Sequence, residues 1–123
     1  SVQSTERPLP QLPEEAVRTL YDGTKRISYA LAMDIVDLVR SDPDLHPQLR
    51  RAGHARLTRH PIPVDDIDRL WHRLLDGPVN ELAASLLGLD DHGELLRDTM
   101  PFAGVIPEPR RMAIARRARH DHK

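Results

Sequence analysis

The feature that most constrains this chain is a long stretch of helical periodicity between Pro13 and Ser41. Residues that fit one helix face recur there at steps of three and four, at Val17, Leu20, Thr24, Ile27, Leu31, Ile35 and Leu38. This spacing places them on one stripe of an α-helix. Pro13 suits the first helical position, and the acidic residues Glu14 and Glu15 favour the positive end of the helix dipole. We therefore expect residues 14–40 to form a helical spine on which shorter helices fold.

The predicted spine has one weak point, at Asp22-Gly23-Thr24. A glycine in a helix interior costs about 1 kcal/mol relative to alanine. Either the helix runs through this point, or a short first helix ends here and Thr24 caps a second one. The apolar stripe keeps its phase across Gly23, which favours one continuous helix.

Composition indicates helices for the rest of the chain as well. The 123 residues suit one domain with a modest core. Aromatic residues and strand formers are scarce, and no run of about 18 apolar residues is present to span a membrane. Because the chain has no cysteine, disulfides, thiolate nucleophiles and cysteine-containing zinc sites are excluded.

Apolar periodicity and Pro or Gly punctuation predict further helices at 45–59, 64–76, 78–87, about 90–100 and 109–119. The apolar stretch 102–107 between the last two should cover the bundle without being helical. We therefore expect an all-α fold, a compact bundle of five to six helices around one long N-terminal helix. Its predicted parts are a flexible, Pro-containing arm (1–12), a single helical domain (13–109) and a basic C-terminal helix or tail (110–123).

The net charge of −1 is unevenly distributed. Residues 110–123 contain six basic residues and one acidic residue, a charge of +5, so residues 1–109 carry −6. A basic tail of this kind can track a phosphate backbone without base specificity. It can equally fold back on the acidic body, pair with a second subunit or bind a partner protein. No aromatic residue is interleaved to stack on single-stranded bases.

Arginines also gather in the predicted helix 45–59. The candidate nucleic-acid contacts are Arg50, Arg51, Arg56 and Arg59 in that helix and Arg110, Arg111, Arg116, Arg117 and Arg119 in the tail. The alternative for the first group is a solvated helix whose arginines pair with the acidic body.

Residues 79–99 loosely resemble a helix-turn-helix, because Ala84 and Gly88 are spaced like the small residue and turn glycine of that motif. The position six residues after the glycine should be apolar, yet it is Glu94. Acidic residues in the second helix would repel phosphates. Two packed helices with a glycine turn explain the pattern without DNA, and no family resemblance is close enough to name.

Chemistry-bearing motifs are absent from the sequence. The seven histidines form no HxxxH, HExxH or ExxH pair on a predicted helix. Acidic clusters lie at helix starts, where capping explains them. Nucleophile elbows, P-loops and GxGxxG are missing. We expect no enzyme activity, no metal and no cofactor.

The second half of the spine carries apolar residues beyond its main stripe, and such excess usually marks an interface. The predicted interface residues are Ile27, Leu31, Met33, Ile35, Val36 and Leu38. Asp34 and Asp37 lie near this surface and either face solvent or pair with an arginine across the interface.

The sequence predicts no specific biochemical activity. The N-terminus has neither the basic start nor the apolar core of a secretory signal, so we expect a cytoplasmic protein. We expect a small soluble regulatory or adaptor protein that acts through protein–protein contacts, as a homodimer or with a partner protein. The alternative is a transcriptional regulator that binds nucleic acid through the arginines named above.

Overall fold

The computed structural model describes residues 7–57, 66–101 and 103–120, and within these ranges every regular element is helical. The α-helices are α2 (Glu14–Thr19), α3 (Gly23–Ser41), α4 (Leu45–Leu57), α5 (Asp66–Asp76), α6 (Val79–Leu86), α7 (Asp91–Asp98) and α8 (Glu108–His120). A short 3₁₀ turn, η1 (Ala103–Val105), precedes α8. The predicted all-α class is confirmed.

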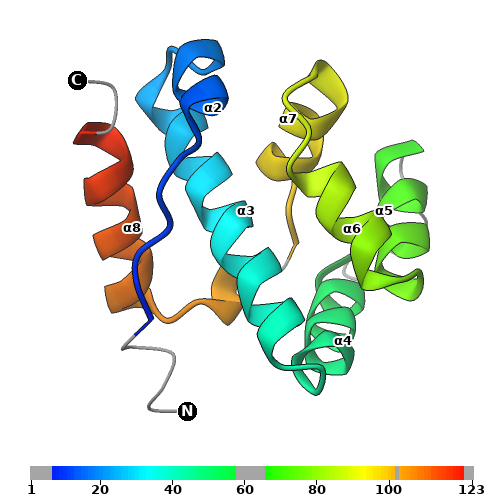
Figure 1. Ribbon diagram of the computed structural model, residues 1–123. Coiled ribbons are helices and arrows are strands. Elements are labelled where there is room, and N and C mark those ends of the chain that lie inside the picture. Colours follow the sequence, from blue (N-terminus) through cyan, green and yellow to red (C-terminus); the bar gives the residue numbers. More distant parts are fainter. Residues whose placement is uncertain (1–6, 58–65, 102, 121–123) are drawn as a thin grey trace.

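Helix α3 is the centre of the arrangement. It packs against α8 along one side, and it also contacts α4, α6, α7 and η1 (Figure 1). Helices α4 and α5 pack against each other, as do α6 and α7. The long helix therefore acts as the expected scaffold, although it is shorter than the sequence suggested.

The continuous helix expected over residues 14–40 is broken. Leu20 is extended, and α3 begins after Asp22, whose side chain accepts a hydrogen bond from the Thr24 amide at 2.8 Å. The Arg26 guanidinium donates to the carbonyls of Leu20 and Tyr21, which the break leaves without helical partners. A capping carboxylate and a buried arginine thus stabilise the break, and the described residues hold seven α-helices instead of five or six.

The core is built from apolar side chains of almost every helix. Its fully buried large members are Ile35, Leu49, Trp71, Leu75, Leu86, Leu96, Ile106 and Ile114. Ile106 comes from the predicted covering stretch 102–107, and its burial agrees with that role. The stretch was expected to be non-helical, whereas Ala103–Val105 form the 3₁₀ turn η1; Phe102 lies outside the described residues. None of the described helices combines the length and the apolar character needed to cross a membrane.

The stretch with the helix-turn-helix spacing forms two packed helices, α6 and α7, joined by a tight turn. Asp90 caps α7 by accepting from the Gly93 amide at 2.9 Å. Buried Arg97 donates to the carbonyls of Leu86 and Gly88. The turn is so close that a Cβ added to Gly93 would lie 2.2 Å from the Gly88 carbonyl oxygen. Glycine is thus required at Gly93 because the two backbones touch.

We expect Gly93→Ala to destabilise the protein by about 1–3 kcal/mol, the usual cost of overpacking, because the atom it meets is backbone and cannot move aside. The matched control is Gly104→Ala, where an added Cβ meets nothing within 4 Å. Urea unfolding followed by circular dichroism measures both variants. Equal stability of the two variants would contradict the close contact.

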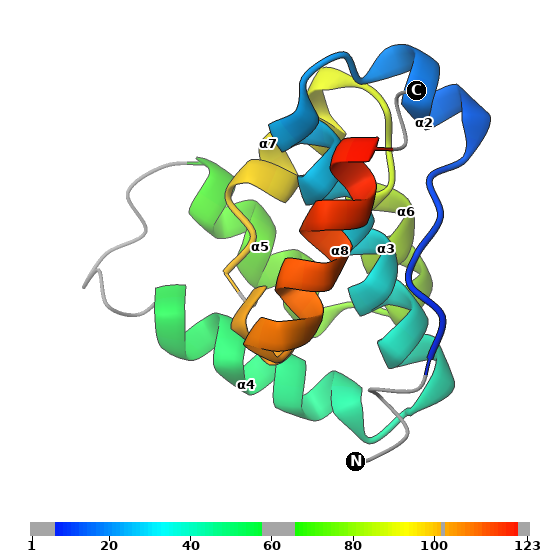
Figure 2. The same ribbon diagram turned by 90° about the vertical axis from the view of Figure 1, so that its left-hand side faces the viewer.

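The basic C-terminal segment is a helix of the bundle. Helix α8 lies against α3, in front of it in Figure 2, and buries Ile114 and Ala118. Arg110, Ile114 and Ala118 are spaced by four residues and form its inward stripe. The sequence set residues 110–123 apart as a basic helix or tail, and in the structure residues 108–120 form a helix that packs on α3.

Candidate binding groove along helix α8

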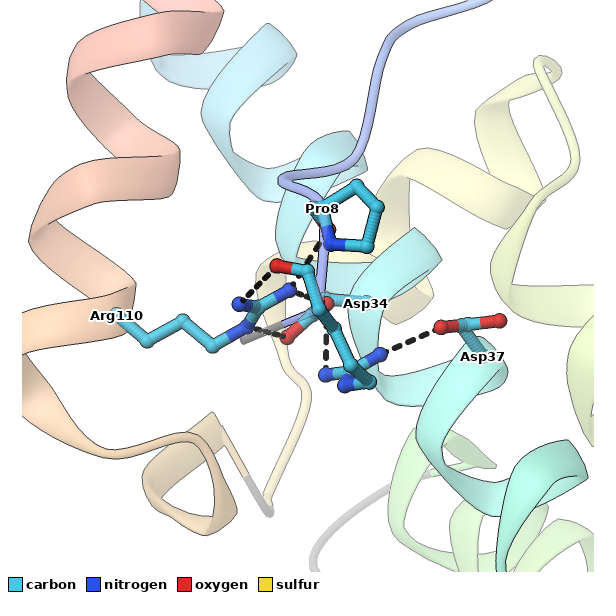
Figure 3. A network of polar contacts seen from close by, with 5 residues as sticks. Pro8, Asp34, Asp37 and Arg110 are labelled. Carbon is cyan, nitrogen blue, oxygen red and sulfur yellow. Dashed lines mark hydrogen bonds and ion pairs between the residues drawn. The ribbon is translucent and has the colours of Figure 1, made fainter. Parts of the chain in front are cut away.

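The polar centre of the structure is Asp34, in the middle of α3. Its side chain is 2% exposed, and arginines from both ends of the chain reach it. Arg110 of α8 donates two hydrogen bonds to its carboxylate, from Nε to Oδ2 at 3.0 Å and from Nη2 to Oδ1 at 2.8 Å (Figure 3). Arg7 adds a third, from Nη2 to Oδ1 at 3.0 Å. Asp34 thus pairs with arginines of its own chain.

The same two arginines hold the N-terminal arm in place. Arg110 donates from Nη1 to the Arg7 carbonyl and from Nη2 to the Pro8 carbonyl, both at 3.0 Å (Figure 3). Arg7 also forms an ion pair with the exposed Asp37. The arm was expected to be flexible over residues 1–12. Its described part, residues 7–12, is extended and fixed by these contacts, and residues 1–6 lie outside the described residues.

Burial makes this cluster, Arg7–Asp34–Arg110, energetically sensitive. The hydrogen bonds to Asp34 raise the pKa of Arg110, since they favour the charged guanidinium more than burial opposes it. A charge taken out of water must keep its partner, and breaking a buried pair by removing one side costs about 3–5 kcal/mol. The cluster therefore fixes the relative positions of the arm, α3 and α8.

Two adjoining hollows lie between the arm and α8. One, of about 470 Å³, is lined by Leu9, Ala113, Arg116 and Arg117. The other, of about 220 Å³, is lined by Leu9, Pro109, Arg110 and Ala113. Because both share Leu9 and Ala113, we treat them as one feature, the α8 groove. Leu9 belongs to the arm, so the groove depends on the contacts that hold the arm.

The α8 groove joins apolar and cationic surface. Leu9 and Ala113 are half-buried, while Arg116 and Arg117 are exposed. Two further residues of α8 face solvent: Met112, just before Ala113, is 57% exposed, and Arg119, after Arg117, is also exposed. Among the described residues, none of the three exposed arginines forms an ion pair. Their charge is therefore available to a ligand.

The structure divides the arginines that the sequence grouped together. Arg110 is buried in the Asp34 cluster and Arg111 is half-buried. The predicted nucleic-acid contacts that α8 leaves exposed are Arg116, Arg117 and Arg119.

In α4, Arg50 is half-buried and its Nε donates to the Leu75 carbonyl at 3.2 Å. Arg51 and Arg56 are exposed, and Arg59 lies outside the described residues. Arg50 and Arg110 therefore have structural partners that the sequence did not reveal.

The predicted interface on the spine is largely covered within one chain. Ile35 and Val36 are 1% and 6% exposed, so a partner cannot reach them without opening the core. The other four, Ile27, Leu31, Met33 and Leu38, are half-buried and pack against the core. The expectation assumed that the remaining helices could not cover the spine. It did not foresee that α8 would cover the spine, because the many arginines of residues 110–119 obscured the buried stripe of Arg110, Ile114 and Ala118.

No group of three or more His, Asp or Glu side chains within the described ranges is arranged to hold a metal ion. In comparisons with protein-family models, curated proteins and solved structures, nothing matches this chain. The α8 groove is therefore a candidate site on structural grounds alone, and its only sequence signal was the cluster of arginines in residues 110–123.

We expect Arg110→Ala to lower the free energy of unfolding by about 3 kcal/mol or more, because Asp34 would lose the partner that grips both its oxygens. The matched control is Arg117→Ala, which removes an exposed arginine of the same helix and should change stability by about 0.5 kcal/mol or less. Urea unfolding at neutral pH compares the two. Similar losses in both variants would show that the cluster does not hold α8.

Proposed function

We propose that this protein is a small regulatory or adaptor protein that acts by binding another protein, and that the α8 groove receives the partner. The observation that supports this most is the pairing of an apolar floor, Leu9 and Ala113, with the exposed arginines Arg116 and Arg117. Such a surface complements an acidic segment that carries an apolar side chain.

Each part of the groove has a distinct task in this proposal. The partner's apolar side chain rests on Leu9 and Ala113, where its burial supplies binding energy. Its carboxylates pair with Arg116 and Arg117, whose planar guanidiniums recognise carboxylates with two parallel hydrogen bonds. The position of Leu9 is set by Arg7 and Arg110 through Asp34, so the floor is formed before the partner arrives. Such preorganisation lowers the entropy cost of binding.

Nucleic acid is the second candidate ligand. Arg116, Arg117 and Arg119 are exposed within about one turn of α8 and could contact phosphates. Against this, Arg110 is already neutralised by Asp34, and residues 1–109 carry a net charge of −6 that would repel a polyanion. An acidic protein segment needs fewer cations than a duplex, which favours the protein partner.

Self-association was first expected through the spine. Burial of Ile35 and Val36 removes two of the residues on which that expectation depended. We therefore propose a different protein as the partner of the α8 groove. A second copy of the chain is an alternative occupant, which light scattering at micromolar concentration would reveal as a dimer.

The test uses a fluorescently labelled peptide in which glutamates flank a single leucine, and fluorescence anisotropy at low salt measures its affinity. We expect binding that is lost when glutamine replaces the glutamates. The double change Arg116→Gln and Arg117→Gln should weaken binding about tenfold, the equivalent of about 1.4 kcal/mol for two charge-assisted contacts.

The matched control changes two exposed arginines of α5, Arg69→Gln and Arg73→Gln, and should keep the affinity of the unaltered protein. A 20-base-pair DNA duplex is the second probe. Equal binding of the glutamate and glutamine peptides would refute the proposal. Tighter binding to the duplex, with a steep salt dependence, would favour the nucleic-acid alternative.

A further inference from the structure

Three polar side chains join helices α4 and α5, one from α4 and two that follow it by 18 and 22 residues in α5. The Nδ1 atoms of His54 and His72 lie 2.8 Å apart, and their ring planes are 23° from parallel. On the other side of the His54 ring, Nε2 lies 2.9 Å from Oδ1 of Asp76. The order is Asp76, His54, His72, with His54 from α4 and the other two from α5.

Only one proton fits between the Nδ1 atoms of His54 and His72. One Nδ1 must donate and the other must accept, so the hydrogen bond exists when both rings are neutral. It also exists when His54 alone is charged, since His54 then donates to both neighbours. When both rings are charged, two N–H groups face each other and the bond becomes a repulsion between like charges. The closed form therefore takes up one extra proton, whereas two separated imidazoles take up two.

Of the two rings, His54 is the one that contacts a carboxylate, because its Nε2 lies 2.9 Å from Oδ1 of Asp76. Asp76 and Asp68 lie one turn on either side of His72 in α5, and Arg50 lies one turn before His54 in α4. The hydrogen bond from His54 lowers the pKa of Asp76, so this carboxylate stays ionised and attracts the proton on His54.

Helix α6 packs against α5 and carries Glu81, whose Oε2 lies 3.5 Å from the point where a Cβ on Gly77, the residue after Asp76, would be. The described part of α3 makes no hydrogen bond or ion pair to either ring.

Besides the His54 contacts, α4 is held by the hydrogen bond from Arg50 to the Leu75 carbonyl and by packing against α3 and α5. Its buried residues are Leu49 and Gly53. Gly53 forms the contact with α5, because a Cβ there would lie 2.6 Å from Cδ1 of Leu75. A helix with so few buried apolar contacts belongs to the part of a structure that opens first.

We propose that His54 and His72 form a proton-controlled clasp that holds α4 against α5 at neutral pH and releases it in mild acid. Release uncovers Leu49 and Leu75, which are 0% exposed when the clasp is closed. The direction follows from the proton count. Because the open form binds one more proton, the closed form loses stability as the pH falls below the ordinary histidine pKa of about 6.5. One extra proton corresponds to about a tenfold change in the opening equilibrium per pH unit.

Native-state amide hydrogen exchange at pH 7.5 and pH 5.0, corrected for the intrinsic effect of pH, tests the clasp on the full chain. We expect the opening equilibrium of α4 amides to rise about 30-fold between these conditions, because pH 5.0 lies about 1.5 units below 6.5, while central amides of α3 stay protected. A change below about twofold in α4 would overturn the proposal.

The diagnostic variant is His72→Asn, because its side-chain amide can replace the Nδ1 contact to His54 but does not titrate. Its ratio of α4 opening between the two pH values should fall well below that of the unaltered protein, leaving only the response of His46, whose pKa burial lowers. His92→Asn removes an exposed histidine of α7 and should keep the full response. Each ratio is taken within one variant, so a general loss of stability does not affect the comparison. A wild-type response in His72→Asn would also overturn the proposal.

Discussion

The buried carboxylate of Asp34 is the interaction on which the rest of the structure depends. A charge at this depth must be compensated, and the two groups that compensate it come from the N-terminal arm and from α8. Arg110 lies 76 residues from Asp34 along the chain. Both ends of the described chain are thereby fixed on the central helix, and the space left between them is the α8 groove.

The basic residues near the C-terminus have two different roles in the folded protein. Residues 110–123 resembled a basic tail because their arginines are frequent and their apolar residues are few. Folding sorts these arginines by the helical period, with Arg110 turned inward beside Ile114 and Arg116 and Arg117 turned outward. One arginine therefore stabilises the fold while its neighbours remain available for binding. The structural and binding roles are neighbours on one helix, which couples the shape of the groove to the stability of the bundle.

The proposed binding surface is the α8 groove and not the apolar face of α3, because the fold covers much of that face. An apolar excess on α3 suggested a partner subunit, but α8, the other helices and the arm supply much of that cover from within the chain. The surface that remains is cationic with a small apolar floor. It suits a charged partner segment better than a broad apolar interface, and on this basis the protein is proposed to bind an acidic segment of another protein.

The sequence by itself determined the helical class and the positions of most helices. Periodicity and Pro or Gly signals predicted 64–76 and 78–87, and the helices observed are Asp66–Asp76 and Val79–Leu86. These signals act within one or two turns, so they can be read locally. The break before α3 is also local, because it is stabilised by the Asp22 cap and by hydrogen bonds from Arg26 to residues five and six positions away. Tertiary structure decided the partners of Asp34 and the meeting of His54 with His72. Each depends on groups brought together by packing, where the cost of burying a polar group, and not local propensity, selects the contact.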